Sequence, residues 1–201
     1  TVFVHNGEET IAVDDVIISA DTFHVRMPLF DSEFTGVPGS DSTISGFWSN
    51  HLKGPDYRIP FKARASQVHR FTQQADNRHD ISGNWECHFA EGTADAYPAI
   101  GIFKSVNGRV TGTFGTETGD YRYLDGVMHG DSLFLSSFDG SHAFLFNAEV
   151  RGDSLIGRFR SGIHSQEPWV AVRNQTFELR NPDSLTFLKE GHDMVDVRLP
   201  D

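Results

Sequence analysis

Apolar and polar residues alternate along most of this chain, with a period of two that predicts β-strands. In the run from 142 to 150, Phe144 and Phe146 share one side while Asn147 and Glu149 take the other. Asn107-Gly108 separates two such runs and is a strong local signal for a hairpin. Strands with turns at intervals of about 8 to 12 residues are typical of a meander that closes into a barrel or folds into a sandwich. We therefore expect an all-β protein.

A segment near the start of the chain returns about halfway along it, with its turns, aromatic residues and closing arginine in the same order. The matched pairs are Val13 to Val16 with Leu124 to Val127, Asp21 to Val25 with Asp131 to Leu135, Phe30 to Ser32 with Phe138 to Gly140, Asp41-Ser42 with Asp153-Ser154, and Pro60 to Arg64 with Trp169 to Arg173. Duplication at this spacing predicts two related antiparallel modules, each a barrel or a sandwich.

These modules divide the chain into four parts. We expect a first β module at 1–72, a polar linker at 73–82, a second β module at 83–176, and a helix and tail at 177–201. The first module begins at the counterpart of a strand that lies inside the second, so we expect about thirty residues of this module to be missing from its front. An unpaired sheet edge is expected where those strands belong.

A short helix is predicted after the second module. Asn181 can cap its first turn, Pro182 suits the first helical position, and Gly191 can end it, which gives about nine residues.

One short pattern occurs three times: an apolar residue, a spacer, a glycine, a spacer and an aromatic residue. The three copies lie at 44–48, 110–114 and 155–159. By the period of two, the three patterned residues share one face, and the glycine leaves room for a close approach or a sharp bend of the strand. We expect the three copies to occupy equivalent places in the sheets.

The composition of the chain excludes several classes of partner and chemistry. The net charge is −11, and no cluster of Lys or Arg interrupts it. The chain therefore has no basic surface of the kind that binds a nucleic-acid backbone, and we expect no nucleic-acid partner. The single cysteine, Cys87, cannot form an internal disulfide and sits in an alternating run that predicts a buried position. No apolar stretch approaches the ~20 residues that span a bilayer. No cofactor is indicated by any motif.

Several runs in fixed order resemble one family. They are Gly83-Asn84-Trp85, Thr116 to Leu124, Phe138 to Phe144, Glu167 to Arg173 and Pro182 to Leu188. Together they resemble the β-rich region that precedes the redoxin domain in TlpA-like thiol-disulfide oxidoreductases of bacterial cell envelopes, and the tail at 197–201 looks like the opening strand of that domain. The resemblance implies a periplasmic or envelope location and a thioredoxin-like parent protein. It transfers no catalytic residue, because the family's cysteines match no position here.

A looser likeness is to lipocalin-type barrels. In these barrels a Gly-x-Trp motif lies on the first strand, and an arginine late in the barrel packs over the tryptophan. The likeness implies these structural roles for Trp85 and Arg173.

The candidate sites are few. Asp139, Ser141 and His142 contain the ingredients of a hydrolytic triad, but neighbouring residues of a strand face opposite sides, so a turn in which Asp139 caps backbone amides is the better interpretation. His142 combines an inward direction with a loop position. The ten histidines show no metal-ligand spacing, so no metal site is predicted.

A ligand or partner surface is the other candidate. Tyr121, Arg122 and Tyr123 can line a mouth or a contact surface, although cross-strand pairing is the simpler interpretation. Trp169 raises the same question, because its counterpart Pro60 is not aromatic.

Three functions remain open. The first is a non-catalytic accessory domain that positions a redoxin domain or docks another envelope protein. The alternative is a lipocalin-like carrier of a small apolar ligand, although the 17 phenylalanines favour an interior filled by side chains. The third, an independent hydrolase, rests on the Asp, Ser and His cluster alone.

Overall fold

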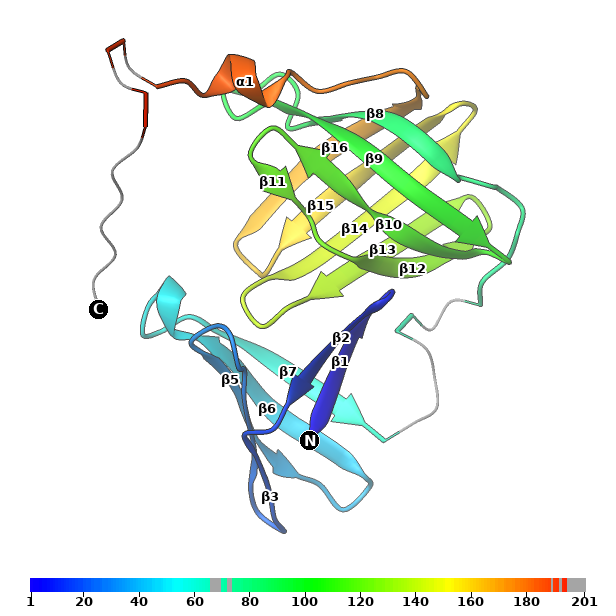
Figure 1. The fold of residues 1–201 in the computed structure, drawn as a ribbon. Helices are drawn as coiled ribbons and strands as arrows, with labels where there is room; N and C mark the ends of the chain where they lie inside the picture. The colour runs from blue at the N-terminus through cyan, green and yellow to red at the C-terminus, as the bar shows by residue number, and fades with distance from the viewer. Residues whose placement is uncertain (66–69, 72–73, 189, 192, 195–201) are drawn as a thin grey trace.

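The protein has two lobes, both built from antiparallel strands (Figure 1). The computed structural model describes residues 1–65, 70–71, 74–188, 190–191 and 193–194. The all-β fold class is confirmed, with a closed barrel in one lobe and smaller sheets in the other. Among the described residues, no helix is long and apolar enough to cross a bilayer.

Eight strands form the barrel, in the upper lobe of Figure 1. Each strand pairs with its neighbours in sequence, and β16 returns to pair with β8, so the sheet closes on itself. A two-residue strand, β11 (Gly119–Asp120), pairs antiparallel with the last two residues of β10. The eight strands are β8 (Gly83–Phe89), β9 (Tyr97–Val106), β10 (Arg109–Thr116), β12 (Leu124–His129), β13 (Ser132–Phe138), β14 (Ala143–Arg151), β15 (Ser154–Ser161) and β16 (Ser165–Arg173).

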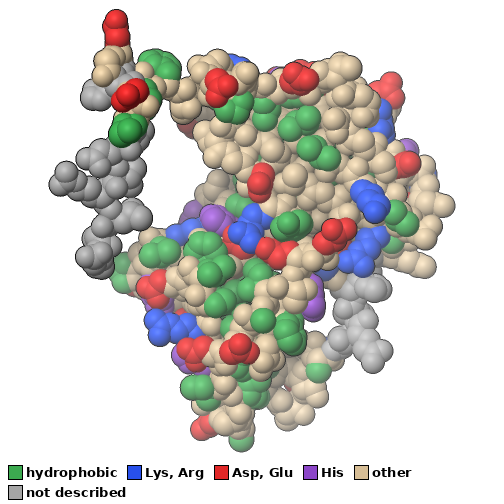
Figure 2. Space-filling model, in the orientation of Figure 1, with side chains coloured by type: hydrophobic (Ala, Val, Ile, Leu, Met, Phe, Trp, Pro, Cys, Tyr) green, Lys and Arg blue, Asp and Glu red, His purple; other side chains and the backbone are tan. Residues whose placement is uncertain are grey.

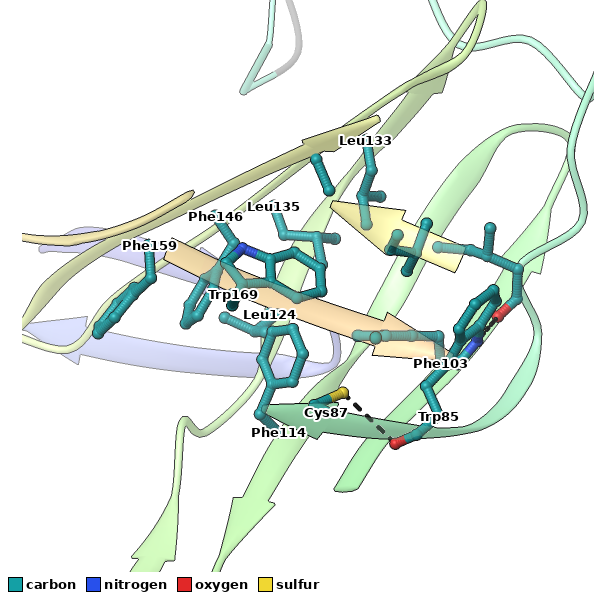
Figure 3. Close-up of a cluster of buried hydrophobic side chains, with 14 of the residues drawn as sticks. Trp85, Cys87, Phe103, Phe114, Leu124, Leu133, Leu135, Phe146, Phe159 and Trp169 are labelled. Atoms are coloured by element: carbon teal, nitrogen blue, oxygen red, sulfur yellow. Dashed lines mark hydrogen bonds between the residues drawn. The ribbon is translucent and has the colours of Figure 1, made fainter. Parts of the chain in front are cut away.

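Aromatic rings fill the barrel (Figure 3). Phe89 and Phe114 are fully buried, and their ring centroids lie 5.3 Å apart. Phe146 lies between Phe114 at 4.8 Å and Phe159 at 4.3 Å. Such a ladder of ring contacts leaves the lumen packed by side chains, as the phenylalanine content predicts.

The three patterned glycines do allow close approach between strands. A Cβ added at Gly46, Gly112 or Gly157 would lie 2.0, 2.1 or 2.1 Å from a carbonyl oxygen of the neighbouring strand. No side chain fits at such a distance, so each of these positions requires glycine. Gly46 lies in the first lobe and the other two in the barrel, at β10 and β15.

The lower lobe holds an open sheet and a separate hairpin (Figure 1). The sheet follows the order β3-β4-β5-β6-β7, and its two edge strands have no further strand partner among the described residues. The hairpin covers one face and contributes Val4, Ile11 and Val13 to the core of this lobe. The elements are β1 (Val2–Asn6), β2 (Glu9–Val13), β3 (Val16–Ile18), β4 (Phe23–Arg26), β5 (Ser32–Pro38), β6 (Thr43–Asn50), the 3-10 turn η1 (His51–Lys53) and β7 (Arg58–Arg64).

The five strands of the open sheet correspond in sequence to the last five of the barrel, β12 to β16. One detail of this repeat needs correction. Gly46 pairs with Phe61, and Gly157 pairs with Trp169. The structural counterpart of Trp169 is therefore Phe61, an aromatic residue, and not Pro60. The alignment of the two repeats in sequence is shifted by one residue at this point, because the register is fixed only by the hydrogen-bonded pairing of the strands.

The helix is shorter than predicted. Asn181 does cap it by accepting the Asp183 amide, but α1 (Pro182–Leu185) has four residues instead of about nine. Phe187, which follows it, is 87% exposed, so no apolar face packs to stabilise further turns. The tail at 197–201 lies outside the described residues, as does part of the segment that joins the modules.

The described part of that linker lies against the barrel. The Asp76 amide donates to the carbonyl of Met128, and its carboxylate accepts the Gly130 amide at 2.7 Å. Ile81, near the linker's end, is buried in the barrel core. A segment predicted from its polarity to be a connector thus also covers one side of the barrel.

Candidate functional site

Three predicted residues meet where the two lobes join: Asp139, His142 and Arg122. Charged side chains and histidines gather at this boundary (Figure 2). Asp139 follows β13 and is 4% exposed. One carboxylate oxygen accepts the amides of Ser141 and His142 at 2.8 and 2.7 Å, and the other faces His142 Nδ1 at 3.0 Å. The turn that caps its own backbone is therefore as expected.

Arg122 connects this turn to the other lobe. Its Nε lies 3.8 Å from the second carboxylate oxygen of Asp139, and its guanidinium also pairs with Glu9 of β2. Arg122 has φ +55°, in the left-handed region, and its amide donates to Asp120 Oδ1 at 2.7 Å. The strained backbone and the amide bond together aim the side chain at the joint.

Backbone bonds and a ring complete the joint. Asn6 of β1 donates to the Phe138 carbonyl at 2.8 Å and accepts the Phe138 amide at 3.0 Å. The Phe138 ring then enters the core of the lower lobe, 5.4 Å from Phe34 and 5.3 Å from Trp48 between centroids. The barrel thus supplies an aromatic residue to the smaller core.

The two turns that echo each other in the sequence lie face to face. Ser32 Oγ donates to the carbonyl of Gly140, and Phe30 meets His142 edge to face at 6.3 Å. Asn50 donates to the Ser141 carbonyl at 3.1 Å. The repeated Phe-Asp turn therefore serves as a contact between modules in both copies.

The charge at the joint is fixed by its hydrogen bonds. Burial raises the pKa of Asp139, but the hydrogen bonds from the His142 ring and from the amides of His142 and Ser141 outweigh burial, so the pKa lies below its usual value. Asp139 is therefore an anion near neutral pH, held between Arg122 and His142.

This cluster lacks the geometry of a hydrolytic site. A triad needs a nucleophile hydrogen-bonded to the base, and among the described residues no such bond joins the Ser141 hydroxyl to His142. The His142 ring instead stacks on Phe144 at 4.9 Å. The arrangement joins two lobes and orders a turn.

The remaining predicted residues separate. Trp169 is 1% exposed in the barrel core, so it offers no ligand surface. Tyr121 packs on the core at the barrel mouth, with its ring 5.0 Å from Phe159. Tyr123 is 53% exposed and points to a different place, a groove on the outer wall. The candidate surface predicted from the sequence therefore does not form: Trp169 lies in the core, Tyr121 at the barrel mouth and Tyr123 in the groove.

The groove runs between the β1–β2 turn and the outer wall of the barrel, with a volume of about 630 Å³. Ile102 and Tyr123 form exposed apolar surface in it, at 47% and 53%. The hydroxyl of Thr113, also in its wall, is buried and has no hydrogen-bond partner. The further lining residues are Gly7, Glu8, Phe103, Lys104, Thr111, Gly112, Asp120, Arg122 and Leu124.

A second hollow, of about 540 Å³, lies at the barrel mouth and contains two residues that the sequence did not single out, Tyr97 and Glu167. Tyr97 donates to Glu167 Oε1 at 2.6 Å, and its hydroxyl lies 2.5 Å from that of Tyr121. A signal did exist, because each shares one side of its strand with buried apolar residues: Tyr97 with Ala99 and Phe103, and Glu167 with Trp169 and Ala171.

At the opposite end of the barrel, Arg173 lies over Trp85 at 4.6 Å from the ring centroid. Its guanidinium also donates to the carbonyls of Ser82 and Asp80 at 2.6 and 2.7 Å. Trp85 Nε1 donates to Ile81 at 2.9 Å. The stacking expected from the lipocalin likeness is therefore present, and it closes this end.

Thiol and metal chemistry find no support in the described residues. Cys87 is fully buried, and burial raises the pKa of its thiol to about 12, so it is protonated near neutral pH. No group of three or more His, Cys, Asp or Glu side chains within the described residues could hold a metal ion.

No family model matches this chain, and neither does any curated protein or solved structure with which it was compared. The likeness to TlpA-like proteins therefore stays a prediction.

Proposed function

We propose that this chain is a non-catalytic accessory domain of the cell envelope that docks the redoxin domain of a TlpA-like thiol-disulfide oxidoreductase. The observation that carries the proposal is the use made of Asp139, His142 and Arg122. Asp139 and His142 are the predicted residues suited to acid–base chemistry, and they bond to each other. Arg122 contacts Asp139 and pairs with Glu9 of the other lobe, and the His142 ring meets Phe30 of that lobe. A protein that commits such residues to its own assembly acts as a scaffold.

The docking surface is the groove between the β1–β2 turn and the barrel wall. Both lobes line it, so its shape depends on the joint. Tyr123 and Ile102 supply exposed apolar area, and tyrosine is among the residues most enriched where binding energy concentrates.

The redox step belongs to the partner in this account. Cys87 is enclosed by the core, with its Sγ 3.4 Å from the Trp85 carbonyl (Figure 3). A buried, protonated thiol neither attacks a disulfide nor forms one with another chain. The filled lumen counts against the alternative of an apolar ligand carrier, since the rings of Phe114, Phe146 and Phe159 occupy that space.

The test is a titration of this chain with the redoxin domain of a TlpA-like protein encoded in the same genome, measured by calorimetry. We expect saturable one-to-one binding, weakened at least tenfold by Tyr123→Ala. Val37→Ala is the matched control, because Val37 is 60% exposed on the other lobe and outside the groove. The proposal is wrong if no heat of binding is seen, or if Tyr123→Ala and Val37→Ala bind alike.

A further inference from the structure

The two ends of the barrel are closed in different ways. At one end, Trp85 and Arg173 stack and bond to the linker backbone, which seals the lumen. At the other, Tyr97 and Glu167 point inward from β9 and β16, and the hollow of about 540 Å³ lies above them. Among the described residues, the second end combines polar side chains with free space.

A chain of hydrogen bonds fixes the protons at this mouth. Tyr97 donates to Glu167, so the Tyr97 oxygen is left to accept the proton of Tyr121. Burial, followed by the hydrogen bond that Tyr97 donates to Glu167, raises the pKa of Tyr97 well above its ordinary value. Both phenols are therefore neutral, and Glu167 is the acceptor at the end of the chain.

Glu167 has no positive partner. Among the described residues, no Lys, Arg or His lies within ion-pair distance of its carboxylate. The other acidic side chains at the mouth are Asp120 and Glu117, and Glu117 is already paired with Arg180. Among the described residues no basic side chain lines the hollow, so its acidic side chains disfavour an anion.

Apolar and aromatic side chains form part of the floor and wall, beside the polar residues Thr116, Thr118 and Ser165. Phe159 lies directly across the ladder from Glu167 and is 5% exposed. Tyr97 stacks on Phe89 at 5.0 Å, with Pro98 next to it in the wall. A carboxylate without a basic partner, placed beside aromatic rings, is the combination that binds an ammonium group, because charge, a hydrogen bond and the ring quadrupole all favour a cation.

We propose that the barrel mouth binds a small aliphatic amine in its protonated form. The ammonium group donates to Glu167, whose second oxygen is free of hydrogen bonds among the described residues, and the alkyl body lies on Phe159 and Pro98. The lumen below is filled, so the ligand sits at the mouth and is limited to a few carbon atoms beyond its nitrogen.

The test uses butylammonium, with butanol and butyrate as probes of the same size and different charge. Chemical shifts of Tyr97, Tyr121 and Phe159 are followed by NMR in the intact chain. We expect saturable shifts with butylammonium, at least tenfold weaker binding of butanol, and none of butyrate. Equal binding of butylammonium and butanol, or no saturable shift up to about 100 mM, would overturn the proposal.

A variant pair sharpens the result. Glu167→Gln retains an oxygen that can accept from Tyr97 but removes the charge, so butylammonium affinity should fall at least tenfold. Glu149→Gln is the control, because Glu149 lies on the outer wall beside Arg151. Unchanged affinity in a folded Glu167→Gln protein contradicts the proposal, and the comparison of the three probes decides the matter if that variant does not fold.

Discussion

The barrel and the open module are built from the same repeated strands, yet they differ in what completes them. In the barrel, β8, β9 and β10 close the gap between β16 and β12. In the open module, the gap between β7 and β3 has no strand in it among the described residues, and the hairpin β1–β2 covers one face instead. Among the described residues, its cluster of buried apolar side chains is Val13, Val25 and Met27, to which the barrel adds the partly buried Phe138. Trp48 is also buried and packs on Phe138.

This difference indicates that the local sequence pattern determines where strands form, whereas closure of the sheet into a barrel determines how stable each module is. An open sheet of five strands leaves two edges and little buried area, so it depends on a neighbour for part of its core. We therefore regard the barrel as the stable part and the open module as dependent on it.

The largest effect is expected at the two equivalent glycines. Gly157→Ala places a Cβ about 2.1 Å from the Asn147 carbonyl oxygen, and Gly46→Ala places one about 2.0 Å from that of Thr35. Each should cost about 3 kcal/mol or more in the free energy of unfolding. Gly157→Ala should unfold both lobes, whereas Gly46→Ala should unfold the open module only.

Near-UV circular dichroism and urea unfolding distinguish these outcomes. If Gly46→Ala abolishes the tertiary signal of Trp85 and Trp169 as fully as Gly157→Ala does, the barrel is not independent of the open module.

Removing the shared ring is the next test. Phe138→Ala should cost about 2 to 3 kcal/mol, because it empties a site between Phe34 and Trp48. The loss should fall on the open module, although residue 138 belongs to a barrel strand. Amide exchange in β4 to β6 should accelerate while that in β14 and β15 stays slow. Uniform acceleration in both lobes would argue against a joint of this kind.

Much of this fold could be predicted from local signals. The turn at Asn107-Gly108 lies between β9 and β10 as expected, with both residues at positive φ. The repeat was found because turns and aromatic residues keep their order. What could not be predicted is non-local: the place of Phe138 in the other lobe's core and the pairing of Phe61 with Gly46 depend on packing and ladder register.

The joint should respond to acid. The folded pKa of Asp139 lies below that of an unfolded aspartate, about 3.9, so its ionised form stabilises the protein above that value. This stability is lost as the pH falls through the folded pKa. Unfolding free energies from pH 7 to pH 3 should therefore decline more steeply below about pH 4 in the native chain than in Asp139→Asn. Parallel curves would remove Asp139 from the account.

A smaller effect is expected from the ion pair across the joint. Arg122→Gln removes the charge facing Glu9 and Asp139 and should cost about 1 kcal/mol, because Arg122 is partly exposed. The cost should shrink in 1 M NaCl, as measured by urea unfolding at both salt concentrations. A loss of several kcal/mol that is insensitive to salt would show that buried contacts of the Arg122 side chain, and not its charge, hold the turn.

The candidate site was only partly visible in the sequence. Asp139 and His142 stood out because they are close neighbours in a turn, and the structure does place them in contact. Tyr97 and Glu167 were missed because they lie 70 residues apart and meet only when β16 pairs with β8 and β8 with β9. A motif search detects residues that are close in sequence, whereas strand pairing in the barrel brings together residues that are far apart in it.

Hydrogen exchange measured residue by residue tests the central claim most directly. If the closed barrel is the stable unit, amides of β8 to β10 and β12 to β16 should share one high protection level, set by global unfolding, and those of β3 to β7 should exchange at least tenfold faster through a smaller opening. Equal protection in the two lobes, or higher protection in the open sheet, would contradict the account.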